Sequence, residues 1–125
     1  MYYQATIETP QNTPQLYAKI TRLQVAQGMI VSLMVGMAPG CAGLCHVQIR
    51  DKGWQIVPWT PDADLAWDDF VFEFPNRYAL ETEPFELVIL TWNLDDTYAH
   101  TVFVGVNIDE GETGPAPRVQ QYPLL

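Results

Sequence analysis

Hydrophobic alternation with a period of two constrains the fold more than any other feature of this chain. Successive side chains of a β-strand point to opposite faces of a sheet, so apolar residues at every second position predict strands with a buried face. The apolar sets that alternate in this way are Tyr3, Ala5 and Ile7; Cys45, Val47 and Ile49; Phe70, Phe72 and Phe74; Phe85, Leu87 and Ile89; and Val102, Val104, Val106 and Ile108.

Proline and glycine residues separate these segments and mark the turns between them. The pattern predicts eight strands, near residues 2–8, 17–26, 29–37, 44–50, 54–59, 69–74, 85–93 and 101–108. One stretch competes as a helix, because Leu16, Ile20 and Leu23 have helical spacing. Thr21 and Val25 favour a strand there.

The chain has 125 residues, of which 48% are hydrophobic and 17% charged, a composition typical of one globular domain. Eight antiparallel strands in such a domain predict an all-β sandwich or barrel. Their spacing fits a jelly roll, with two four-stranded sheets packed face to face. An immunoglobulin-like sandwich is the nearest competitor, but it requires two cysteines far apart in sequence. We expect the sandwich to span residues 1–110 and residues 111–125 to form an extended C-terminal arm, since that segment has no strand periodicity.

The charge of the chain excludes several kinds of partner. Its formal net charge is -9, and its six basic residues are scattered, so they cannot form the patch that nucleic acids or anionic membranes require. The N-terminus lacks the basic and apolar regions of a signal peptide. The longest apolar run, 29–38, is too short to span a bilayer. These features predict a soluble protein made in the cytoplasm, whose acidity favours solubility or a cationic partner.

Cys41, Cys45 and His46 form a C-x3-C-H motif. Haem attachment uses C-x-x-C-H, with one residue fewer, and a zinc site needs four ligands. Strand alternation also directs Cys45 and His46 to opposite faces. We therefore expect a small buried thiol at Cys45 and a loop thiol at Cys41, with a short disulfide as the main alternative and a metal site as a remote third.

Asp62, Asp64 and Asp68 lie close together in the segment 61–69 and are a weak candidate for a calcium site, because calcium prefers several oxygen ligands on a flexible loop. The spacing is not that of an EF-hand, and a solvated acidic loop is the simpler interpretation. The smaller pair Asp95 and Asp96 is interpreted as a hairpin turn.

Trp59 and Trp67 flank this acidic loop, where they could stack on sugar rings or contact a protein partner. Trp54 and Trp92 lie on predicted strands, where we expect core or interface positions.

The sequence gives little support for catalysis, since the chain has no G-x-S-x-G motif and its single serine, Ser32, lies inside an apolar strand. With fifteen acidic residues, the chain could still be a hydrolase that uses two carboxylates, although the sequence singles out no such pair. We expect no enzymatic activity, cofactor or metal.

A series of landmarks runs through residues 17–108. They are Gly28, Pro39 and Gly40, the hairpin at 51–53, the segment 54–58, the segment 84–87, Trp92 and Asn93, and the strand from Thr101. The order of these landmarks resembles, as a pattern, small jelly-roll proteins that decorate the capsids of tailed viruses. The resemblance implies a homo-oligomer, commonly a trimer, that sits on coat proteins in the virion after synthesis in the host cytoplasm, and it implies no catalytic residues.

We therefore expect a structural assembly protein, most simply a capsid decoration subunit. Its candidate partner-binding residues are Trp59 and Trp67 in the loop and Tyr122, Leu124 and Leu125 in the arm, which carry apolar side chains with no strand of their own. The alternative is a carbohydrate-binding sandwich module of a fibre or of a secreted enzyme.

Overall fold

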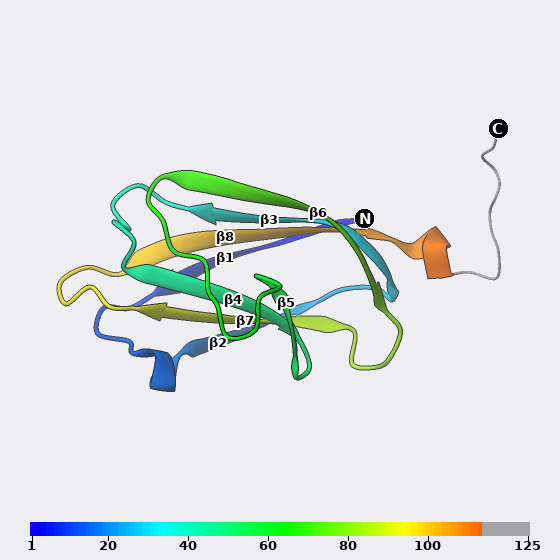
Figure 1. Ribbon diagram of the computed structural model, residues 1–125, viewed down its shortest axis with the longest axis horizontal. Coiled ribbons are helices and arrows are strands. Elements are labelled where there is room, and N and C mark those ends of the chain that lie inside the picture. The colour runs from blue at the N-terminus through cyan, green and yellow to red at the C-terminus, as the bar shows by residue number, and fades with distance from the viewer. Residues whose placement is uncertain (114–125) are drawn as a thin grey trace.

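A computed structural model of the protein describes residues 1–113, so the arm residues Tyr122, Leu124 and Leu125 lie outside the described part of the chain. The described residues form two packed antiparallel sheets (Figure 1). The elements are β1 (Tyr2–Thr9), the 3-10 helix η1 (Gln15–Tyr17), β2 (Lys19–Gln24), β3 (Gly28–Met37), β4 (Cys45–Asp51), β5 (Trp54–Val57), β6 (Phe70–Leu80), β7 (Glu86–Asn93), β8 (His100–Asp109) and the 3-10 helix η2 (Glu110–Thr113).

The first sheet has the strand order β1-β8-β3-β6 and the second has the order β2-β7-β4-β5. All of the strand pairs are antiparallel. Only β4 and β5 are consecutive strands of one sheet, and every other connection between described strands crosses to the opposite sheet. The predicted all-β sandwich of eight strands is thus confirmed. Asp95 and Asp96 do not form the expected hairpin turn, because they join β7 to β8, which belong to different sheets.

The core lies between the inner faces of the two sheets, and the alternation seen in the sequence explains which side chains it contains. Its fully buried members include Ile30, Leu33 and Val35 of the first sheet and Leu87 and Ile89 of the second. Removing such a side chain from water contributes about 1.5–3 kcal/mol by area bookkeeping. These central strands therefore position the loops at the sandwich edges.

Strand β6 is longer than the sequence predicted. The expected strand ended before Pro75, but β6 continues through it to Leu80. Proline lacks a backbone N–H and is tolerated on edge strands, and β6 is the edge strand of the first sheet. The register of β3 shifts between Ile30 and Ser32, opposite this proline, so the ladder accommodates it.

Two other strands are shorter than predicted. The segment expected as a strand over 17–26 forms β2 only from Lys19 to Gln24, and η1 precedes it, so Leu16 lies in a 3-10 turn rather than in a longer helix. β5 ends at Val57 rather than at residue 59, and the chain then leaves the second sheet as a loop over residues 58–69. In Figure 1 this connection passes beside β4 before it rises to β6 in the other sheet.

Candidate functional site: the aromatic loop beside β4 and β5

The loop 58–69, which we call the aromatic loop, is tied to β4 by backbone hydrogen bonds. Val47 and Leu65 exchange two N–H to carbonyl bonds of 2.9 and 3.0 Å, and the N–H of Gly43 donates to the carbonyl of Trp67 at 3.2 Å. The loop thus continues the second sheet alongside the half of β4 that the short β5 leaves unpaired. Its two ends are exposed as expected, but residues 63–66 are half-buried against the sheet.

Two glutamine side chains fasten the same loop. The Gln55 amide nitrogen donates to the carbonyls of Pro58 and Ala63 at 2.8 and 2.9 Å, and its oxygen accepts the N–H of Asp62 at 3.1 Å. Gln48 is buried and donates to the carbonyl of Ala63 at 2.8 Å. A glutamine amide offers both donors and an acceptor, which suits it to bind several loop groups at once. Neither glutamine was predicted from the sequence as part of the site.

The aspartates of the aromatic loop have separate structural roles. Asp68 Oδ1 accepts the backbone N–H groups of Gly40 and Ala42 at 2.9 and 2.8 Å. Asp64 Oδ1 lies 2.6 Å from His46 Nδ1, and Asp62 is exposed. The structure therefore does not bring Asp62, Asp64 and Asp68 together. Within residues 1–113, no three His, Cys, Asp or Glu side chains gather closely enough to hold a metal ion.

The C-x3-C-H residues point apart, as strand alternation predicted. Cys45 faces the core between the sheets, whereas His46 lies on the outer face, where its ring stacks on Trp92 at 5.3 Å with an interplanar angle of 5°. Cys41 and Cys45 are both free thiols, so the alternative of a short disulfide is wrong in this structure. Cys41 is a loop residue, as predicted, and it is as deeply buried as Cys45.

Both thiols are poor nucleophiles in this environment. Burial, followed by the neighbouring Asp68 carboxylate, raises the pKa of Cys41. Burial and then the proximity of Cys41 raise the pKa of Cys45 to about 12. The thiolate is the form that attacks electrophiles and binds metals, so both cysteines stay protonated and unreactive near neutral pH.

The tryptophans divide into exposed and buried ones. Trp59 and Trp67, the predicted contact residues, are 68% and 60% exposed. Trp54 is 75% exposed, so a core position is wrong for it, because it directly follows the exposed turn of the β4–β5 hairpin; the interface alternative stays a prediction. Trp92 is buried as expected, although it packs with His46 outside the core between the sheets.

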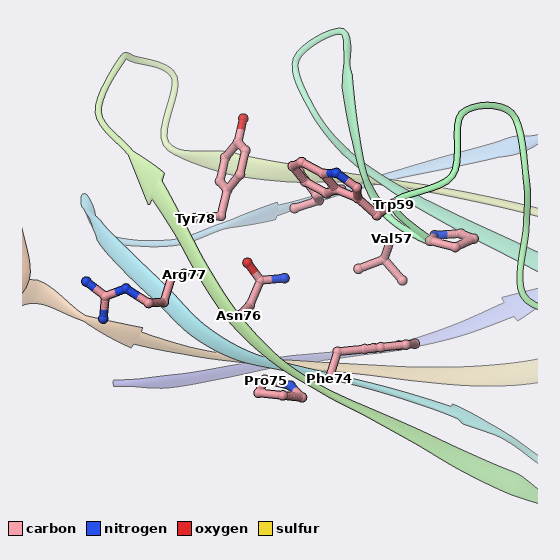
Figure 2. A pocket seen from close by; sticks show the side chains of 9 residues that line it. Val57, Trp59, Phe74, Pro75, Asn76, Arg77 and Tyr78 are labelled. Carbon is pink, nitrogen blue, oxygen red and sulfur yellow. The ribbon is translucent and has the colours of Figure 1, made fainter.

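Two hollows meet at Trp59. One, of about 480 Å³, opens between β5 and β6. Figure 2 shows Phe74, Asn76 and Tyr78 directed from β6 toward Val57 and Trp59, while Pro75 and Arg77 lie on the other side of the strand. The second hollow, of about 310 Å³, lies over the β4–β5 hairpin and is lined by Arg50, Gly53, Trp54, Gln55, Trp59, Pro61 and Asp62.

Tyr78 links the first hollow to a buried carboxylate. Its hydroxyl donates to Asp51 Oδ2 at 2.8 Å, and its ring meets Trp59 edge to face at 6.3 Å. Burial and the bond to Asp51 raise the pKa of Tyr78 to about 12. The phenol therefore remains a neutral donor under ordinary conditions, and its bond to Asp51 positions the ring that contacts Trp59.

The histidines are paired with aspartates. His100 Nε2 lies 2.7 Å from Asp95 Oδ2. The backbone N–H of Thr97, followed by the bond from His100, lowers the pKa of Asp95. The hydroxyl of Ser32 accepts a bond from Asn107 at 2.9 Å on the first sheet. Among the described residues, neither imidazole is hydrogen-bonded to a serine or a thiol.

The fold and the site define a class: an antiparallel β-sandwich with an aromatic loop fastened along one edge. Compared with known proteins, the chain has no match among protein-family models, curated proteins or solved structures. Across residues 1–113, no helix has the length and apolar character needed to cross a bilayer.

Proposed function

We propose that this chain is a non-catalytic structural assembly protein with jelly-roll connectivity, and specifically a capsid decoration subunit that forms a homo-oligomer, a trimer, and binds coat proteins. The strand order supports the jelly-roll interpretation. A jelly roll winds eight strands through two sheets as two Greek keys, with connections that pass back and forth between the sheets. The orders β1-β8-β3-β6 and β2-β7-β4-β5 have this alternating character.

The open edge of β6 is the single observation that carries the assembly role. β6 has 11 residues and pairs only with β3 among the described strands. An unpaired strand edge offers its N–H and carbonyl groups to another chain. At the start of this edge Phe70 and Val71 are 47% and 52% exposed. Pro75, which cannot donate a hydrogen bond, limits pairing to the N-terminal half of the strand.

The outer face of the first sheet extends this apolar edge. Gly36 lies between Val71 of β6 and Phe103 of β8 in the sheet register. A Cβ atom at Gly36 would lie 3.4 Å from Phe103 Cδ2 and 3.7 Å from Val71 Cγ2, so the two side chains approach each other over the glycine. We call Phe70, Val71 and Phe103 the β6 edge patch, in which Val71 and Phe103 share the outer face and Phe70 lies beside them at the start of the edge strand, where its ring contacts Phe72. Its apolar character suits a protein interface.

The negative net charge of this chain supports a partner with a basic surface. With a formal net charge of -9, copies of this chain repel each other at long range, so association between copies depends on apolar contact. A coat protein with a basic face would instead be attracted to the subunit.

The proposal predicts that a coat protein is encoded beside the gene of this chain, and co-sedimentation with shells of that protein tests it. The unmodified chain should pellet with the shells. Val71→Lys and Trp67→Ala should reduce the bound fraction, because one places a charge on the β6 edge patch and the other removes an exposed anchor. Ile20→Lys is the matched control, since Ile20 is similarly exposed on β2 of the other sheet. Equal binding by Val71→Lys and Ile20→Lys would contradict the assignment of the surface.

The expected contribution of Tyr122, Leu124 and Leu125 concerns residues outside the described part of the chain and stays a prediction. Deletion of residues 114–125 should leave the circular dichroism spectrum of the sandwich unchanged while lowering oligomer content. An unchanged oligomer would contradict a role for the arm.

A second candidate function is carbohydrate binding, and one observation favours it. Trp54 and Trp59 are both exposed and line the same hollow over the β4–β5 hairpin. Flat aromatic faces beside polar groups are a common arrangement for sugar rings. Affinity electrophoresis in gels containing soluble neutral polysaccharides is the direct test, and unretarded migration in every gel would contradict this candidate.

A further inference from the structure

The hollow over the β4–β5 hairpin, which we call the hairpin hollow, combines large aromatic surfaces with charged groups. Its volume of about 310 Å³ lies at the small end of the roughly 300–1,000 Å³ typical of ligand pockets. Trp54 lies at its strand end and Trp59 on the loop side. Exposing two indole rings at one site leaves apolar surface in water, which a stacked ligand would cover.

Two side chains of opposite charge line the same hollow. Within residues 1–113, the guanidinium of Arg50 makes only long bonds, of 3.2–3.4 Å, to Gln48, Gln55 and the carbonyl of Gly53. The carboxylate of Asp62 accepts no hydrogen bond from residues 1–113, although its own backbone N–H is held by Gln55. Arg50 therefore offers donors and Asp62 offers acceptors to a ligand.

The loop-side wall of the hollow, which carries Trp59, is held in place before any ligand binds. Gln55 holds the backbone on both sides of Trp59, through the carbonyls of Pro58 and Thr60 at 2.8 and 3.1 Å. The Trp59 ring packs against Tyr78 in a T-shaped contact, and Tyr78 is itself bonded to Asp51. Preorganised side chains lose little entropy on binding, so a small ligand can bind measurably at such a site.

From these contacts we infer that the hairpin hollow binds one ring of a neutral saccharide, which stacks on Trp59 and Trp54 and places adjacent hydroxyl groups between Arg50 and Asp62. The inference rests on the second candidate function and assigns its site. A neutral ring with hydroxyl groups fits because each hydroxyl both donates and accepts. An anionic ligand would be repelled by the carboxylate of Asp62 and by the net charge of -9, and a cationic ligand would be repelled by the guanidinium of Arg50.

The site should not need calcium. Asp64 and Asp68, the other carboxylates of the calcium candidate in the sequence, already have partners: Asp64 is bonded to His46, and Asp68 accepts the N–H groups of Gly40 and Ala42. Calcium takes six to eight oxygen ligands, and Asp62 alone cannot supply them. This separates the inferred site from sugar sites in which a metal ion bridges protein and hydroxyl groups.

Titration of the whole chain with neutral hexasaccharides of β-1,4-glucan, β-1,3-glucan, mannan and xylan, followed by tryptophan fluorescence and calorimetry, tests the inference. At least one should bind, equally well with and without EDTA. Trp59→Ala should weaken that binding about tenfold or more, because losing an aromatic contact worth about 1.4 kcal/mol is a tenfold change in affinity. Trp54→Ala and Asp62→Asn should weaken it several-fold.

Trp67→Ala is the matched control, because Trp67 is similarly exposed on the same loop but does not line the hollow. It should retain the affinity of the unmodified chain. If a saccharide binds but Trp59→Ala and Asp62→Asn bind it normally, the inferred site is wrong while the carbohydrate function stands. If none of the four saccharides binds, both are overturned. Thermal melts of the variants distinguish loss of the site from loss of the fold.

Discussion

The hydroxyl of Tyr78 donates a hydrogen bond of 2.8 Å to Oδ2 of Asp51, and this contact joins the two sheets at their open edge. Tyr78 belongs to β6 of the first sheet and Asp51 to the end of β4 in the second. Lys52 Nζ lies 3.1 Å from the other oxygen of the same carboxylate. Because Asp51 is buried, the two partners together satisfy a charge that would otherwise be costly.

Tyr78→Phe should therefore lower the free energy of unfolding by about 1–2 kcal/mol, since a bond to a charged group is lost and a buried acceptor is left with fewer partners. Urea denaturation followed by circular dichroism measures the change. Tyr17→Phe is a suitable control because Tyr17 is exposed on η1. Equal stability of Tyr78→Phe and the unmodified protein would show that this contact does not hold the edge.

The contribution of Tyr78 should disappear in alkali. Its pKa is about 12 in the folded protein and 10.0 as an ordinary tyrosine, so the unfolded chain loses this proton first as the pH rises. The stabilisation is fully present below pH 10 and declines through pH 12. The difference in urea midpoint between the unmodified protein and Tyr78→Phe should accordingly shrink over this interval. A difference that grows with pH would contradict the assignment.

Asp68 should matter for stability more than its exposed position suggests. Its carboxylate accepts two backbone N–H groups of the turn before β4, at 2.9 and 2.8 Å. We expect Asp68→Ala to cost about 1–2 kcal/mol of unfolding free energy. Asp69→Asn serves as the control, since asparagine tolerates the positive φ of 46° at that position. The expectation fails if both variants have the same thermal midpoint.

The cysteines should be unreactive and free of metal in the native protein. Burial and the raised pKa of Cys45, about 12, predict negligible reaction with Ellman's reagent at pH 7.5, and two thiols per chain after denaturation in guanidinium. Elemental analysis of protein purified without chelator should find no stoichiometric zinc or iron. Rapid native labelling, or a metal that is lost in Cys45→Ser, would contradict this account.

Alternation in the sequence, together with the prolines and glycines between the segments, located the eight strands, because a strand with one buried face has apolar residues at every second position. It also separated Cys45 from His46 correctly. The ends of strands depend on tertiary context. A proline would end a central strand, but Pro75 is tolerated because β6 is an edge strand, and only the whole topology determines which strands are edges.

The site was less accessible to sequence reasoning. Trp59 and Trp67 stood out because they flank an acidic loop, and both are exposed. Gln55, which fastens that loop, lies within an apolar segment and has no local signature, since its partners are backbone carbonyls that only the folded loop brings near. A core position for Trp54 was wrong because a large aromatic on a strand is usually covered, whereas Trp54 stands at the exposed turn that joins β4 to β5.

The mass of the whole chain in solution tests the central claim most directly. Sedimentation velocity at micromolar concentrations and physiological salt should show a species of three 14.2 kDa chains for the unmodified protein. Val71→Lys should shift it toward monomer, while Ile20→Lys should leave it unchanged. A monomer of the unmodified chain at every concentration, with Val71→Lys sedimenting identically, would contradict the account of this protein as an oligomeric assembly subunit built on the open edge of β6.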